Sequence, residues 1–235
     1  MEKKAKLICF AVLLFAGMSG TAQAEESSKT EGFKLGVDVV SSYVWRGSEL
    51  SESPSIQPFA SYTFDGIGVI IGAWGTNNFG EVSAATVKRY RETDLYITVP
   101  VGLVNISLID YYIPSQSLTA STKAFDFKSD GPNTLDLTAA CNVNDFSLLG
   151  SVFVGGNTFK NAKYVEAGYQ FHNKNKFTAK ATVGLGDEGA YAVSKGTNHF
   201  ALVNVGCTVS KENFSVSYVY NPAEEHSGLV FAASF

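Results

Sequence analysis

The sequence has little charge, few cysteines and almost no long apolar runs. Asp, Glu, Lys and Arg make up 17% of its 235 residues, against about 25% in average soluble domains. The formal net charge of −4 does not suggest a nucleic-acid partner. Besides Cys9, only Cys141 and Cys207 are present. Two cysteines are too few for a disulfide framework, so we expect both to be small apolar wall residues.

The one marked apolar run lies at the N-terminus. Residues 7–15 follow Lys3, Lys4 and Lys6 and precede small residues that end in Ala22-Gln23-Ala24. This order is typical of a secretory signal peptide, and the run is far shorter than the ~18–20 residues of a membrane anchor. We therefore predict a cleaved signal peptide over 1–24, a polar leader over 25–32 and one domain over 33–235.

What the chain does contain in excess is aromatic residues. They reach 13% of the sequence, with 17 Phe and 11 Tyr. Few charges and many aromatics suit a protein whose outer surface meets lipid. Since no stretch after residue 24 approaches a transmembrane helix, the remaining option in a membrane is a closed β-barrel, in which every backbone polar group is paired.

The apolar residues recur with a period of two, which predicts strands rather than helices. In residues 177–185, for example, Phe, Ala, Ala, Val and Leu alternate with Thr, Lys, Thr and Gly. About twelve such segments can be distinguished. They are 33–46, 55–65, 67–76, 92–100, 102–112, 133–142, 146–155, 162–171, 176–185, 198–209, 213–220 and 227–235.

Tight and long connections alternate along the chain. Tight turns are expected at 65–66, near Pro100, and at 142–145, 173–175 and 211–213; the longer connections are 47–54, 77–91, 113–132, 156–161, 186–197 and 221–226. This asymmetry is typical of a transmembrane antiparallel barrel with short periplasmic turns and long extracellular loops. We predict twelve strands, or ten if the connection at 156–161 is misread. A soluble sandwich or barrel is disfavoured because the polar strand positions are rarely charged.

Aromatic residues are predicted to gather at two levels, as in the interfacial belts of membrane barrels. At the short-turn end these are Phe33, Phe64, Phe146, Phe171, Phe177, Phe214 and Phe235. At the long-loop end they are Tyr43, Trp45, Tyr111 and Tyr220.

One segment resembles a known family. Residues 39–47, Val-Val-Ser-Ser-Tyr-Val-Trp-Arg-Gly, resemble the opening strand of the TorF family of porins, which is also catalogued as a conserved hypothetical family of Gram-negative bacteria. The Pro-containing stretch 54–58, the segment Gly72-Ala73-Trp74-Gly75 and the acidic strand 93–96 continue the resemblance. It implies an outer-membrane barrel with a pore and no particular substrate. The motif residues are Ser42, Tyr43, Trp45, Arg46, Gly47, Trp74 and Gly75.

The terminal Phe235, with apolar residues at alternate positions before it, resembles the signal by which outer-membrane proteins engage the barrel-assembly machinery. Outer-membrane lipid and lipopolysaccharide are the other expected partners. The basic run at 88–91 is a candidate contact for lipopolysaccharide phosphates, although such runs are usually just solvated.

Neither a catalytic nor a metal site is expected. Of the three histidines, His172 is placed by a short turn, and only His199 and His226 could be neighbours, without a nucleophile beside them. Glu224-Glu225-His226 lacks a second spaced ligand for a metal. We therefore expect no enzyme and no cofactor.

The ionisable residues on inward-facing strand positions carry what function the barrel has, since charges in a membrane must face water or one another. These candidate pore-lining residues are Asp38, Arg46, Asp94, Asp136, Glu166 and Lys180. They could form a constriction that filters solutes or a salt-bridge network that plugs the lumen. A narrow pore for small hydrophilic solutes is the first hypothesis, and a non-conducting structural or adhesive barrel is the second. Whether 113–132 folds inward stays open.

Overall fold

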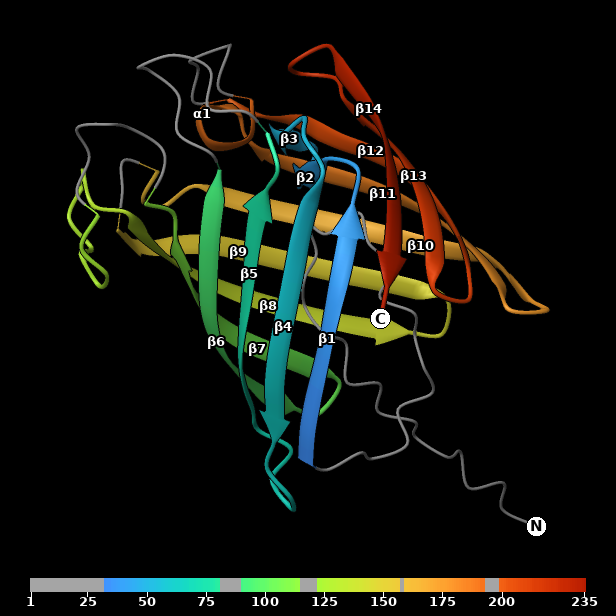
Figure 1. Ribbon diagram of the computed structural model, residues 1–235, viewed down its shortest axis with the longest axis horizontal. Coiled ribbons are helices and arrows are strands. Elements are labelled where there is room, and N and C mark those ends of the chain that lie inside the picture. The colour runs from blue at the N-terminus through green and yellow to red at the C-terminus, as the bar shows by residue number, and fades with distance from the viewer. Residues whose placement is uncertain (1–31, 81–89, 115–121, 157–158, 193–198) are drawn as a thin grey trace.

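The chain forms a closed antiparallel barrel of twelve strands (Figure 1). The computed structural model describes residues 32–80, 90–114, 122–156, 159–192 and 199–235. Both the predicted fold class and the strand number of twelve are confirmed. The expected signal peptide, nearly all of the leader and most of the basic run at 88–91 lie outside the described residues.

Each barrel strand pairs with its neighbours in sequence, and β1 closes the ring between β4 and β14. The barrel strands are β1 (Gly32–Val40), β4 (Ser55–Thr63), β5 (Ile70–Asn78), β6 (Arg91–Val101), β7 (Val104–Tyr112), β8 (Asn133–Val143), β9 (Phe146–Gly156), β10 (Lys163–Lys174), β11 (Phe177–Asp187), β12 (Phe200–Lys211), β13 (Phe214–Asn221) and β14 (His226–Ser234). Two short strands, β2 (Tyr43–Trp45) and β3 (Ser48–Ser51), form a separate hairpin. The helix α1 (Glu188–Tyr191) lies in the connection between β11 and β12.

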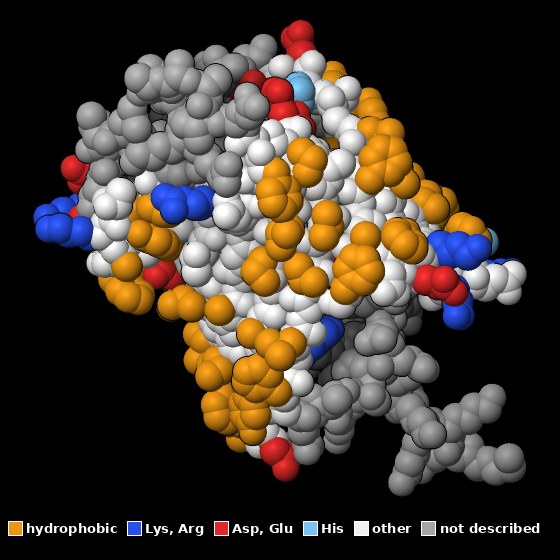
Figure 2. Space-filling view, in the orientation of Figure 1, with side chains coloured by type: hydrophobic (Ala, Val, Ile, Leu, Met, Phe, Trp, Pro, Cys, Tyr) orange, Lys and Arg blue, Asp and Glu red, His pale blue; other side chains and the backbone are white. Residues whose placement is uncertain are grey.

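The period of two separates an apolar outer wall from a polar inner one. Along β13, Phe214, Val216 and Tyr218 are exposed while the serines between them are buried. In the described strands, outward positions in the middle of each strand carry no Asp, Glu, Lys or Arg. Asp110, two residues before the end of β7, also faces outward and lies toward the long-connection end. Figure 2 accordingly shows apolar side chains spread across the strands, with most charged side chains toward the ends of the barrel. This is the reverse of a soluble protein, whose apolar side chains point inward.

Short turns join the strands at one end of the barrel and longer connections join them at the other, as predicted. Two-residue turns follow β6, β8, β10 and β12. Asn175 and Lys176 both have positive φ, at 54° and 64°, as a type I′ hairpin turn requires. The connection between β4 and β5 runs over 64–69, so it is longer than the turn expected at 65–66.

The ring closes where the last residues meet the first strand. Val39 of β1 lies opposite Ala233 of β14, and the backbone N–H groups of Val37 and Phe235 each donate to the other's carbonyl over 2.9 Å. Cys141 and Cys207 are free cysteines on outward positions, which confirms that they are not bridged.

The first predicted strand, 33–46, is wrong at its C-terminal end. β1 stops at Val40, and after Ser41 and Ser42 the chain leaves the wall as the β2–β3 hairpin. Fourteen residues would also exceed the ~9–11 that a tilted strand needs to cross a bilayer.

The predicted aromatic belts are half correct. All seven aromatics assigned to the short-turn end are exposed. At the long-connection end Tyr43 and Tyr111 are buried, with exposed fractions of 3% and 7%, and Trp45 packs beside Tyr111, so these three lie inside the barrel. Tyr220 keeps the outward parity of β13.

Within the described ranges, no helix is both long and apolar enough to span a membrane.

Candidate functional site

The β2–β3 hairpin crosses the barrel lumen. In the ring, β9 is six strands from β1 in either direction, so it faces β1 across the barrel. Arg46, at the tip of the hairpin, nevertheless hydrogen-bonds Ser151 of β9 and Asp136 of β8. A side chain anchored near the end of β1 can reach these partners only if the hairpin spans the interior. We call residues 43–51 the plug hairpin.

The tip of the plug hairpin is a tight turn pressed against the wall. Arg46 and Gly47 have φ values of 50° and 90°, a left-handed conformation that favours glycine and is uncommon for arginine. A Cβ added to Gly47 would lie 1.9 Å from the carbonyl oxygen of Val203 on β12. Gly47 therefore suits the left-handed turn and leaves room for the close approach of the two backbones.

The Arg46 guanidinium hydrogen-bonds polar side chains of the barrel wall and of α1. Its Nη1 donates to Ser151 Oγ at 2.7 Å and to Tyr191 Oη at 2.9 Å, and its Nη2 donates to Asp136 Oδ2 at 2.8 Å. Tyr111 Oη donates to the same carboxylate oxygen at 3.2 Å. Desolvation acts to lower the pKa of Arg46, but the interactions with Tyr191 and Asp136 outweigh it and raise the pKa, so the group is charged.

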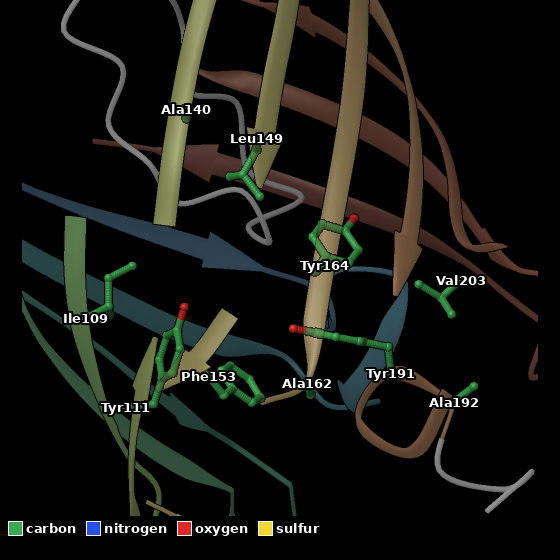
Figure 3. Close-up of a cluster of buried hydrophobic side chains, with 10 residues drawn as sticks. All are labelled: Ile109, Tyr111, Ala140, Leu149, Phe153, Ala162, Tyr164, Tyr191, Ala192 and Val203. Carbon is green, nitrogen blue, oxygen red and sulfur yellow. The ribbon is translucent and has the colours of Figure 1, made fainter. Parts of the chain in front are cut away.

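Aromatic rings also lie around the Arg46 guanidinium. Figure 3 shows Tyr111, Phe153, Tyr164 and Tyr191, from β7, β9, β10 and α1, directed toward a common space. Trp45 enters that space, stacks on Phe153 at 6.2 Å between ring centroids and contacts Tyr191 at 5.4 Å. The Arg46 guanidinium carbon lies 4.9 Å from the Tyr164 ring centroid and 5.8 Å from that of Tyr191, within cation–π range.

The helix α1 fastens the plug hairpin from the side of β11. The backbone carbonyl of Tyr191 accepts hydrogen bonds from Ser48 Oγ and Asn221 Nδ2, each over 2.8 Å. Tyr191 thus holds the hairpin through its backbone and through its hydroxyl.

The remaining sides of the plug hairpin also pack against the wall. Val44 belongs to a buried apolar cluster with Val219, Val230 and other inward residues of β1, β13 and β14. Tyr43 contacts the Trp74 ring at 5.6 Å and the Tyr90 ring at 5.8 Å. Burial, with the charge of Glu92 nearby, raises the pKa of Tyr43 well above its usual range. The hairpin therefore touches most of the ring at this level.

The structure places the six predicted lumenal residues as follows. Asp136 and Asp94 are buried and inward-facing on β8 and β6, and Asp38 is buried on β1. Glu166 is half-buried and accepts from Tyr164 Oη at 2.6 Å and Asn204 Nδ2 at 3.1 Å. Lys180 lies over Gly168, where an added Cβ would be 2.4 Å from its Cε. Of the six, only Arg46 and Asp136 form an ion pair with each other.

The position of Arg46 corrects the sequence analysis. The sequence predicts it on an inward-facing position of a strand over 33–46. Because β1 ends at Val40, Arg46 belongs to the plug hairpin and is 3% exposed.

Deeper in the barrel, hydroxyl side chains line the inward face. Thr98 and Ser107 share a hydrogen bond of 2.7 Å, and Thr208 and Ser217 share one of 2.8 Å. Thr98, Ser107, Thr138 and Ser217 are at most 6% exposed, so side chains fill the lumen at this level too.

The motif residues taken from the family resemblance converge on the plug hairpin. Tyr43, Trp45, Arg46 and Gly47 form its first strand and turn, and Trp74 packs on Tyr43. Ser42 is buried just before the hairpin, and Gly75 lies beside Trp74 on β5. Sequence reasoning missed Ser151, Tyr164 and Tyr191 as partners, because nothing local marks residues that meet only through the barrel closure.

No group of three or more His, Cys, Asp or Glu in the described part of the chain is arranged to hold a metal ion. His226 instead pairs with Glu49 of β3, Nε2 to Oε2, at 2.7 Å. This contact ties the start of β14 to the plug hairpin.

A twelve-stranded barrel with an apolar, uncharged outer band and a polar interior crossed by a hairpin belongs to the class of closed antiparallel β-barrels that suit a bacterial outer membrane. A family model described as a bacterial protein of unknown function, Gcw_chp, matches residues 23–232. The chain therefore belongs to the Gcw_chp family. No curated protein matches it.

Proposed function

We propose that this protein is an exported outer-membrane barrel that offers small hydrophilic solutes a narrow path, closed in the present conformation by the plug hairpin. The observation that supports its membrane location is the uncharged outer band. Leu108 and Ile97, for instance, point outward in mid-strand and are 40% and 42% exposed. Exposed apolar area on every strand would promote aggregation in water and is favourable in lipid.

The polar interior supports a solute path. The inward faces and the plug hairpin carry the carboxylates of Asp38, Glu49, Glu92, Asp94, Asp136 and Glu166 against the cations of Lys34, Arg46 and Lys180. A barrel that only needed to be stable would gain more from an apolar core than from buried charges. The excess of carboxylates predicts a preference for cations over anions in any open state. This conclusion agrees with the resemblance to TorF-family porins.

A permanently closed structural barrel is the second candidate. The filled lumen favours it, because the plug hairpin reaches β5, β8, β9 and β12 at one level. Twelve strands do not decide between the two candidates, since eight leave a filled interior and sixteen an open channel.

Single-channel recording in a planar bilayer separates the candidates. Wild-type protein, Arg46→Ala and the exposed-turn control Lys176→Ala are refolded and checked for the gel shift of folded barrels. A gated pore predicts longer cation-preferring openings in Arg46→Ala than in wild type and no change in the control. If all three fold and none conducts, the structural barrel is the correct account.

We also infer that Phe235 is the assembly signal. Its side chain is 69% exposed beside the β1–β14 closure, where it is accessible to the assembly machinery. Membrane lipid and lipopolysaccharide are the partners proposed for the outer band and the long-connection end.

A further inference from the structure

The pocket around Arg46 is built by the barrel wall and by α1. Asp136, Ser151, Tyr164 and Tyr191 come from β8, β9, β10 and α1, and they supply a carboxylate, hydroxyl acceptors and ring faces. Only Arg46 and Trp45 come from the plug hairpin. Carboxylate, hydroxyls and aromatic faces around one planar cation form a binding site for a guanidinium group.

The fit of Arg46 to this pocket is incomplete. Asp136 is 0% exposed, yet its Oδ1 has no hydrogen-bond partner among the described residues, and neither has Arg46 Nε. Thr138 Oγ1, at the next inward position of β8, is also buried without a partner. A guanidinium not held by a backbone could pair with both oxygens of Asp136, which is the preferred geometry of such pairs.

We propose that the wall pocket is a binding site for small guanidinium-bearing solutes and that Arg46 is a tethered ligand that occupies it when the plug hairpin is in place. The tether gives Arg46 a high effective concentration, so a free solute competes poorly with it in the wild type. Removing the Arg46 side chain empties the pocket without removing any wall residue.

The variant that tests this is Arg46→Gly, because glycine adopts the φ of 50° at no steric cost. Methylguanidinium is added to the refolded variant, and thermal unfolding is followed. A dissociation constant of about 5 mM would raise the melting temperature by about 2–4 °C at about 20 mM ligand. Methylammonium at equal ionic strength, which has the charge without the planar fork, should give no such shift. Wild type should respond to neither.

The matched control is Arg46→Gly combined with Asp136→Asn, which keeps the volume of the pocket and removes the carboxylate. It should not respond to methylguanidinium. Equal responses of the single and double variants, or equal responses to the two cations, would overturn the proposal. If Arg46→Gly folds only poorly, the yield of folded barrel should rise with methylguanidinium, and a yield independent of the ligand would contradict the site.

The role of this pocket in solute selection rests on the proposed pore, but binding does not. A variant that binds methylguanidinium and never conducts would overturn the pore and leave the site standing. A variant that conducts and does not bind would overturn the site alone.

Discussion

The buried ion pair of Arg46 and Asp136 should affect stability mainly through the free-energy cost of removing one partner and leaving the other buried. In Arg46→Met, Asp136 stays buried and loses its 2.8 Å partner, while Ser151 and Tyr191 lose a charged donor. Hydrogen bonds to a charged group contribute about 1.5–3 kcal/mol each, and desolvation of the two ions offsets several kcal/mol of that sum. We expect Arg46→Met and Asp136→Val each to lower the free energy of unfolding by about 3–5 kcal/mol.

The double variant Arg46→Met/Asp136→Val distinguishes the cost of leaving one ion buried without its partner from the cost of removing both ions. With both charges replaced, no ion is left unpaired, so the double variant is expected within about 2 kcal/mol of wild type. Urea unfolding of the refolded barrel, followed by tryptophan fluorescence, measures all three. Single variants that cost less than about 1 kcal/mol, or a double variant that equals the sum of the singles, would refute the reasoning.

Three further predictions follow from the same geometry. Gly47→Ala should destabilise the barrel by at least about 2 kcal/mol more than Gly66→Ala, because both glycines have positive φ but only Gly47 is blocked by Val203; equal urea midpoints would contradict this. The raised pKa of Tyr43 means that this side chain loses its proton at a lower pH in the unfolded state than in the folded state. The free energy of unfolding should therefore fall above about pH 10, and in Tyr43→Phe its slope against pH should be smaller by up to about 1.4 kcal/mol per pH unit. Parallel pH profiles of unfolding for the two proteins would contradict this. Ile97→Arg, in mid-β6, should cost about 2–4 kcal/mol in lipid bilayers, and Val101→Arg at the end of the same strand about 0–1 kcal/mol; similar losses at both positions would argue against a lipid-facing band.

The wall of the barrel was predictable because each strand carries its own signal. Outward Val, Leu and Phe alternate with inward Ser and Thr on strands such as β11 and β13. Three of the four two-residue turns place Gly102, Asn144 or Asn175 at a positive φ, and the turn after β12 uses Glu212. These signals are local in the sequence, so they can be recognised without knowing which strands pair with one another.

The plug hairpin was not predictable in the same way. Residues 39–45, Val-Val-Ser-Ser-Tyr-Val-Trp, alternate less strictly than β1, but they are rich in the β-branched and aromatic residues of strands, so they suggest that the first strand continues. The signals that could have revealed it are the excess length of a strand over 33–46 and the Arg46-Gly47 turn. The contacts of Arg46 with Asp136 and Tyr191 depend on the closure of the barrel. They join residues that are 90 and 145 positions apart in the sequence, respectively.

The most direct test of the account uses a native residue. Cys207 is a free, exposed cysteine on the outward face of β12, opposite Tyr218. In isolated outer membranes, a charged water-soluble maleimide should fail to label Cys207 in the folded protein and should label it after unfolding in urea, because the reactive thiolate forms in water. Rapid labelling of the folded protein by the water-soluble reagent would show that this face meets water and would contradict the outer-membrane barrel.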